Sequence, residues 1–267
     1  MNDPLSHSSP SPSLPQPESP DDSYTYRRYD EFSSTLQSKL PSLPAKSPCR
    51  LLLSKGKNKA AQLSPHTVAL LKDDDENSSN NNNDKKSDDT NKNKSKDKDR
   101  LTVQYPKGST YNVKMKYLLP ITNENKLIIV APETVDYRRL CIVHTPNDHS
   151  FIEIGCDFAL TCGNVDTPKK LGIDKSPTSL DIARENFPTL DLEEVDVLTD
   201  SKENLMNVLE RYEMNDCSKL IVAIDINGNR ELDAVVQCVQ RVVDLWHPRL
   251  VIVKSRSLFS LMLEKGI

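Results

Sequence analysis

The sequence has few aromatic residues, no long apolar run and little net charge, and each shortage excludes a class of protein. Phe, Trp and Tyr make up 5% of the 267 residues, which argues against an aromatic stacking platform for nucleic acid. No window approaches the roughly 18 apolar residues of a membrane span, so we expect no contact with a membrane. The formal net charge of -4 predicts no electrostatic footprint for duplex DNA.

The six cysteines lack the spacing of a metal site. None of them form a C-x-x-C pair, and no Cys/His cluster has zinc-ligand spacing. We therefore expect no metal, and free thiols in a reducing compartment. The N-terminus has no apolar signal segment, and its acids argue against an organellar transit peptide. These features predict a cytoplasmic protein, with the nucleus as the alternative.

Residues 1–100 lack the contiguous apolar sequence that a folded core needs. Ser and Pro dominate residues 1–48, and residues 73–99 are a low-complexity mixture of Asn, Asp, Lys and Ser. Such sequence favours hydrated, extended chain. Two apolar segments, at 49–54 and 66–71, are too short to bury much surface alone. We predict a disordered tail and linker over residues 1–100.

Alternating apolar and polar residues from Leu101 onward predict extended structure. LTVQYP and TYNVKMKYLLPI flank the turn PKGS, which predicts a β-hairpin, and KLIIVAP at 126–132 is a third extended segment. Residues 133–145 predict a helix that leads into the main domain. We assign residues 101–148 to a small β-rich accessory segment.

Strand and helix patterns alternate regularly over residues 149–267. Unbroken apolar runs such as KLIVAI and RLVIV are typical of central parallel strands covered by helices on both faces. Five strands that alternate with helices predict a Rossmann-like α/β domain with a doubly wound, mostly parallel sheet. We expect strands at 151–155, 170–174, 192–197, 219–225 and 248–255, and helices at 177–188, 201–214, 230–246 and 257–266.

Charged side chains stand where the predicted strands end. Ligands of an open α/β sheet bind beyond the carboxyl ends of its strands. Asp174 lies 21 residues after Glu153, the interval typical of an acid that binds both ribose hydroxyls. The alternative is that Asp174 caps the helix that follows it. The residues at successive strand ends are Glu153 with Gly155, then Asp174, Asp196, Asp225 and Lys254.

The ordered motifs Glu-Ile-Gly, LGID, VDVLTD and VAIDING resemble those of class I S-adenosylmethionine-dependent methyltransferases, over less than half of the chain. In that family the first acid and the glycine turn, here Glu153 and Gly155, approach the methionine part of the cofactor. The acid after the second strand, here Asp174, binds the ribose. The acid after the third, here Asp196 with Val197 beside it, addresses the adenine. The resemblance thus implies S-adenosylmethionine as cofactor and methyl transfer as activity.

The glycine turn departs from the family pattern, acid-x-Gly-x-Gly-x-Gly, because Asp157 and Ala159 occupy the later glycine positions. Glycine serves there because backbone must approach the ligand closely or adopt positive φ. Aspartate tolerates the left-handed conformation better than most residues, and Ala159 adds one methyl group. Asp157 therefore joins the predicted cofactor-binding residues. The alternative is a scaffold protein that keeps the fold and has lost the cofactor.

Other enzyme classes fit the motifs less well. A dinucleotide-binding oxidoreductase would need glycine where Asp157 and Leu160 stand, and a serine hydrolase would need a Gly-x-Ser-x-Gly elbow, which is absent. Asp225 and Lys254 resemble two members of the Lys-Asp-Lys-Glu set of ribose 2′-O-methyltransferases, whose lysine helps to deprotonate a hydroxyl. The alternative is that Lys254 only extends from its strand end to solvent.

The motifs leave the methyl acceptor open between RNA, protein and a small molecule. The family's sheet has two further strands, and no sequence remains after Lys265 to supply them. An uncovered edge strand invites aggregation. The edge beyond the fifth strand is therefore predicted to be covered by residues 101–131, to pair with a partner, or to reflect a truncated chain.

Overall fold

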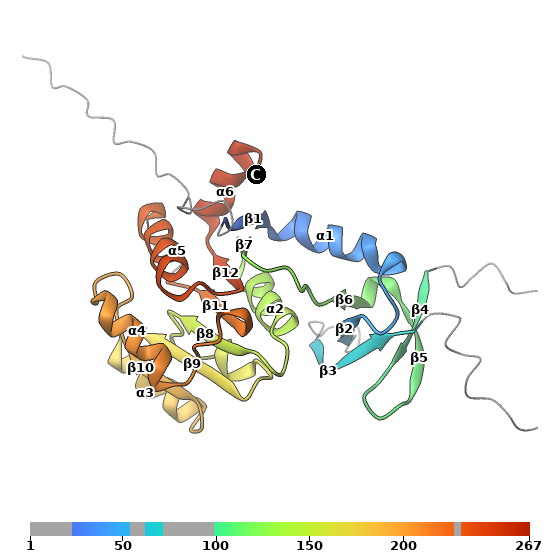
Figure 1. The fold of residues 1–267 in the computed structure, drawn as a ribbon, viewed down its shortest axis with the longest axis horizontal. Coiled ribbons are helices and arrows are strands. Elements are labelled where there is room, and N and C mark those ends of the chain that lie inside the picture. The colour runs from blue at the N-terminus through green and yellow to red at the C-terminus, as the bar shows by residue number, and fades with distance from the viewer. Residues whose placement is uncertain (1–22, 54–61, 72–98, 227–230) are drawn as a thin grey trace, which may run out of the picture. The chain divides into compact units, whose positions relative to one another are not determined.

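The computed structural model describes residues 23–53, 62–71, 99–226 and 231–267 (Figure 1). The chain forms two compact units. Of the described residues, unit 1 comprises 23–29, 124–141, 147–226 and 231–267, and unit 2 comprises 30–53, 62–71, 99–123 and 142–146.

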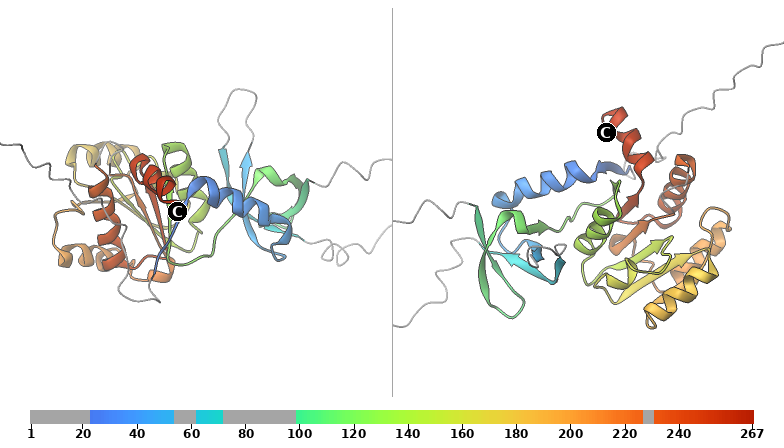
Figure 2. Two further views of the ribbon diagram at one scale, coloured as in Figure 1. Left: turned by 90° about the horizontal axis from the view of Figure 1, so that it is seen from above. Right: turned by 180° about the vertical axis from the view of Figure 1, so that it is seen from behind.

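Unit 1 is built on a seven-stranded sheet with the order β1-β7-β12-β11-β8-β9-β10. Every neighbouring pair of these strands is parallel, and Figure 2 shows the sheet from two further directions. The predicted Rossmann-like α/β architecture with a mostly parallel sheet is confirmed. The strands are β1 Thr25–Arg28, β7 Leu127–Ala131, β8 Ser150–Ile154, β9 Lys169–Asp174, β10 Asp191–Glu194, β11 Leu220–Ile224 and β12 Leu250–Lys254.

Helices cover both faces of this sheet. One face forms a single core with α4, α5 and α6, whereas α2 lies over the other face and reaches β8 through a Tyr137–Glu153 hydrogen bond. Serine side chains cap α3, α4 and α6, and Pro177 occupies the first turn of α3. None of the described helices is long and apolar enough to cross a membrane. The helices are α2 Thr134–His144, α3 Pro177–Asn186, α4 Lys202–Arg211, α5 Leu232–Trp246 and α6 Arg256–Lys265.

The edge of the sheet beyond β12 is completed by segments from the N-terminal half of the chain. β7 pairs with β12, and β1 pairs with β7 from Thr25↔Leu127 onward. Residues 126–132, predicted to lie in the accessory segment, thus supply a fully buried strand of the main sheet. β1 has the sequence TYRR and no buried residue. Backbone hydrogen bonding to β7 and the packing of the partly buried Tyr26 against the core hold it in place.

Unit 2 contains a five-stranded sheet with the order β5-β4-β3-β2-β6, antiparallel in every pair. The predicted hairpin is confirmed: β4 and β5 pair from Arg100↔Lys114 to Gln104↔Thr110. The elements are α1 Tyr29–Lys39, β2 Pro48–Leu53, β3 Gln62–Leu70, β4 Arg100–Gln104, β5 Thr110–Lys114 and β6 Leu118–Pro120; short 3-10 helices span Leu40–Ser42 and Met115–Tyr117 here, and Cys162–Asn164 and Cys217–Lys219 in unit 1.

The prediction of a disordered chain over residues 1–100 is wrong for the described ranges 23–53 and 62–71. The two short apolar segments pair with each other as β2 and β3. Each is too short to be stable alone, but together with β4 and β6 they bury one core. That core consists of Leu40, Cys49, Leu51, Val68, Leu70, Val103 and Leu118. The predicted tail at 1–22 and the linker at 72–98 lie outside the described residues.

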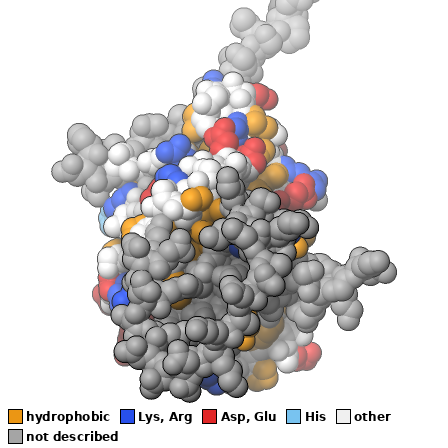
Figure 3. Space-filling model, turned by 90° about the vertical axis from the view of Figure 1, so that its right-hand side faces the viewer, with side chains coloured by type: hydrophobic (Ala, Val, Ile, Leu, Met, Phe, Trp, Pro, Cys, Tyr) orange, Lys and Arg blue, Asp and Glu red, His pale blue; other side chains and the backbone are white. Residues whose placement is uncertain are grey.

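The face drawn in Figure 3 carries both charge signs. Among the described side chains visible there, lysine and arginine lie interspersed with aspartate and glutamate. All six cysteines are free thiols, and Cys217 alone among them is exposed.

Candidate active site at the carboxyl edge of the unit 1 sheet

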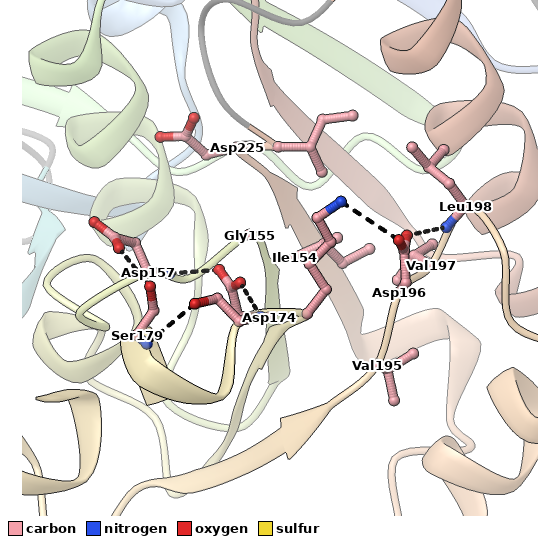
Figure 4. Close-up of a pocket in the computed structure, with 13 residues that line it drawn as sticks. Ile154, Gly155, Asp157, Asp174, Ser179, Val195, Asp196, Val197, Leu198 and Asp225 are labelled. Atoms are coloured by element: carbon pink, nitrogen blue, oxygen red, sulfur yellow. Dashed lines mark hydrogen bonds and ion pairs between the residues drawn. The ribbon is translucent and has the colours of Figure 1, made fainter. Parts of the chain in front are cut away.

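A cavity of about 330 Å³ opens beyond the carboxyl ends of β8, β9, β10 and β11 (Figure 4). It brings together five of the six residues predicted to bind cofactor, together with Asp225; Glu153 does not line it. The cavity is lined by Ile154, Gly155, Asp157, Asp174, Lys175, Ser176, Ser179, Val195, Asp196, Val197, Leu198, Asp225 and Ile226.

Gly155 turns the chain at the end of β8 in a way that only glycine permits. Its φ is +74°, and a Cβ atom there would lie 2.2 Å from the carbonyl oxygen of Asp225. The Gly155 N–H donates to the Ile173 carbonyl at 2.8 Å, and the Asp225 N–H donates to the Ile154 carbonyl at 2.8 Å. The turn is therefore packed between the ends of β9 and β11.

Asp157 and Ala159, which stand at the later glycine positions of the turn pattern, adopt the left-handed backbone conformation that glycine favours. Asp157 has φ +49° and Ala159 has φ +57°, which costs an ordinary residue about 1 kcal/mol. Hydrogen bonds hold Asp157 in place, because its N–H donates to Asp174 at 2.9 Å and its carboxylate accepts from Ser179 Oγ at 3.1 Å. The variant turn thus keeps the left-handed positions without the glycines.

Asp174 orders the turn and faces the cavity. Its Oδ2 accepts from the Asp157 N–H and its Oδ1 from the Ser176 N–H, both at 2.9 Å. The N-cap of α3 is Ser176, whose hydroxyl accepts from the Ser179 N–H at 3.2 Å. Each carboxylate oxygen can accept a second hydrogen bond. Asp174 therefore retains capacity for two ligand hydroxyls.

The end of the cavity nearest β10 combines an acceptor, a donor and apolar side chains. Asp196 accepts from the Leu198 N–H at 3.1 Å, and Lys175 Nζ lies 3.5 Å from its other oxygen. Val197 is buried, and no residue in the described ranges accepts a hydrogen bond from its backbone N–H. Val195 lines the same end.

Glu153 lies within β8, 2% exposed, and reaches the opposite side of the turn. Its Oε1 accepts from the Tyr137 hydroxyl at 3.0 Å and its Oε2 from the Cys162 N–H at 2.8 Å. Burial raises the pKa of this carboxyl from 4.5 to about 7, although the hydrogen bonds from Cys162 and Tyr137 oppose the shift.

Replacing Glu153 with glutamine is expected to flatten the pH dependence of stability. A carboxyl whose pKa is raised on folding stabilises the protein fully below pH 4.5, and this contribution is lost as pH rises through about 7. The loss for the wild-type protein is about 3 kcal/mol, and Glu153→Gln escapes it. Urea unfolding of both proteins at several pH values across that interval measures the difference. Two stability curves that stay parallel would contradict the assignment.

A second cavity of about 230 Å³ adjoins the first, sharing Gly155, Asp157 and Asp225 with it. Asp225 and Lys254, the pair that the sequence suggested for catalysis, meet here: Lys254 Nζ lies 3.1 and 2.9 Å from the two carboxylate oxygens. Two residues from α2, Thr134 and Arg138, also line this cavity, and no sequence motif marks them. The remaining lining residues are Glu153, Cys156, Phe158, Leu160 and Thr161.

An acid also follows β7, the strand beside β12. Glu133 forms two hydrogen bonds with Arg256, at 3.1 and 2.9 Å. These bonds hold the pKa of Glu133 below its usual range, with a further contribution from the charge of Lys254. Glu133 was not among the predicted site residues, because residues 126–132 were assigned to the accessory segment and not to the main sheet.

Comparison with known proteins returned no matching family model and no matching curated protein. Among solved structures, DesVI of Streptomyces venezuelae is similar at 15% identity and a TM-score of 0.32, over 45% of this chain and 48% of that one. A TehB-like SAM-dependent methyltransferase from Corynebacterium glutamicum is similar at 16% identity and 0.32, over 45% and 65% respectively. The chain thus spans less than two thirds of either protein. Likeness at this level carries no functional conclusion, so function must be inferred from the site.

Proposed function

We propose that unit 1 binds S-adenosylmethionine and transfers its methyl group to an acceptor. The observation that carries this proposal is the pair of carboxylates, Asp174 and Asp196, at successive strand ends on one cavity of about 330 Å³. The N–H of Val197 beside Asp196, which has no partner within the described ranges, strengthens it. This set of groups matches the hydrogen-bonding needs of an adenosine.

The polar groups of the cavity fit the two parts of adenosine in order. The vicinal ribose hydroxyls are donors, and Asp174 offers an oxygen to each. The amino group of adenine needs an acceptor, which Asp196 supplies, and a neighbouring ring nitrogen needs a donor, which the Val197 N–H supplies. Val195 and Leu198 contribute apolar surface for the faces of the ring.

The chain contributes to methyl transfer mainly by positioning. When bound, the sulfonium of S-adenosylmethionine supplies a methyl group that passes directly to a nucleophilic atom. The protein must hold that atom in line and keep water out. Asp225 lines both cavities, and its ion-pair partner Lys254 lines the second one. We assign this ion pair to the acceptor side, where the Lys254 ammonium can orient an acceptor oxygen and stabilise negative charge on it.

A scaffold protein without cofactor is the second candidate, and particular contacts favour it. The Asp157 N–H is already bonded to Asp174, and Lys175 lies 3.5 Å from Asp196. A ligand must share these acids with groups of the protein. Scaffold function predicts that no adenosyl compound binds.

Titration of the full chain with S-adenosylhomocysteine by calorimetry separates the two candidates. Methyltransferase function predicts saturable heat, and a stabilisation of about 2.7 kcal/mol at a ligand concentration 100 times Kd. NAD serves as the control ligand and should give neither effect. A flat titration and an unchanged melting temperature with S-adenosylhomocysteine would favour the scaffold.

A further inference from the structure

Arg138 is a cation on the wall of the second cavity. It projects from α2, and no residue in the described part of the chain forms a hydrogen bond or ion pair with its side chain. Lys254, the other cation that lines this cavity, is bound to Asp225 through both carboxylate oxygens. A free guanidinium can hold a carboxylate through two parallel hydrogen bonds. Arg138 is thus the group in this cavity most able to bind an anion.

The rest of the second cavity is suited to a group that carries both charges. Glu153 and Asp157 supply acidic groups, and Thr134 and Thr161 supply hydroxyls. Gly155 lines this second cavity and also the first cavity of about 330 Å³, which we call the adenosine cavity. A ligand that spans both cavities would carry an adenosine at one end and an ammonium and a carboxylate at the other.

We propose that Arg138 binds the α-carboxylate at the amino-acid end of S-adenosylmethionine and so selects the intact cofactor over adenosine compounds that lack this end. The proposal rests on the function proposed above. Arg138 is a binding residue for the cofactor and takes no part in the bond changes at the methyl group. A carboxylate on the acceptor is the other source of the same chemistry, and the experiment distinguishes the two.

Arg139 provides a matched control. It follows Arg138 on the same helix, so it has the same charge and local backbone, but successive helical residues point in directions about 100° apart. Arg139 does not line the second cavity, and its side chain likewise has no partner among the described residues. Loss of Arg139 therefore reports the general effect of removing a positive charge from α2.

The test measures two ligands on four proteins by calorimetry: S-adenosylhomocysteine, which has the amino-acid end, and 5′-methylthioadenosine, which lacks it. Arg138→Met is expected to weaken S-adenosylhomocysteine binding about 10-fold, the loss of one charge-assisted contact. Its affinity for 5′-methylthioadenosine should equal that of the wild-type protein. Arg139→Met should bind both ligands as the wild type does, and Arg138→Lys should recover part of the loss because it keeps the charge.

Each other outcome has a defined meaning. Unchanged S-adenosylhomocysteine binding in Arg138→Met would overturn the proposal, because Arg138 would then not bind the amino-acid end of the cofactor. Equal weakening of both ligands, or an equal loss in Arg139→Met, would also overturn it by indicating a general effect. If the wild-type protein binds neither ligand, the proposed function itself fails, and this result differs from any produced by the variants.

Discussion

Replacing Gly155 with alanine lowers the free energy of unfolding by about 2 to 4 kcal/mol. The added Cβ would lie 2.2 Å from the Asp225 carbonyl oxygen, and the backbone has φ +74°. A left-handed backbone penalises alanine by about 1 kcal/mol, and overpacking against backbone adds about 1 to 3 kcal/mol. The Asp225 carbonyl cannot move aside easily, because the Asp225 N–H is bonded to Ile154. Urea unfolding monitored by circular dichroism measures the loss.

Gly266→Ala is the control that separates the steric overlap of the added Cβ from the strain of the left-handed backbone. Gly266 has φ +70°, close to that of Gly155, but a Cβ there meets no atom within 4 Å. This variant should lose about 1 kcal/mol, the cost of the left-handed conformation alone. Equal losses in the two variants would contradict the close packing of the turn against the end of β11.

Replacing Asp174 with asparagine is expected to weaken S-adenosylhomocysteine binding about 100-fold. Asparagine keeps the shape of the side chain and one acceptor oxygen, but loses the charge and the second acceptor. A hydrogen bond to a charged group contributes about 1.5 to 3 kcal/mol, and both ribose contacts are affected. The same change weakens the bond to the Asp157 N–H, 2.9 Å from Oδ2, so the turn also loses support. Calorimetry of the full chain gives the affinity, and thermal melting gives the change in stability.

Asp244→Asn is the control for this substitution. Asp244 is exposed on α5 and does not line the adenosine cavity, so the variant removes the same charge without touching the site. Its affinity should match that of the wild-type protein. A folded Asp174→Asn variant that binds with undiminished affinity would remove Asp174 from the ribose site, and its role would then be to cap and order the turn.

The five strands that were predicted within residues 149–267 each have at least one of two features. They are apolar over most of their length or end in an acid, because both faces of a central parallel strand are buried and ligands gather at its carboxyl end. β1 could not be found this way, since TYRR offers no apolar run and its pairing with β7 depends on residues about 100 positions away. β2 and β3 were missed because each segment is stable only within the shared core of unit 2.

The site was predictable to the extent that strand ends define it. Asp174 and Asp196 line one cavity because β9 and β10 are parallel neighbours and end at the same edge. Arg138 was not predictable, because α2 precedes the first motif and contributes through its position over the sheet. The burial of Glu153 depends on Tyr137 from the same helix. Arg138 and Tyr137 come from a helix that carries none of the sequence motifs, so no motif marks them as residues of the site.

The position of β7 in the sheet affects how the protein is made. The ribosome synthesises β7 before residues 150–224, yet its partner, β12, comes last among the strands. The apolar side chains of β7, including Ile128 and Ile129, are fully buried in the completed sheet, in which β12 is a direct neighbour of β7. Contacts so distant in sequence form slowly. The sheet of unit 1 therefore cannot close before β12 has been synthesised, and until then the nascent protein exposes an aggregation-prone strand that molecular chaperones are suited to shield.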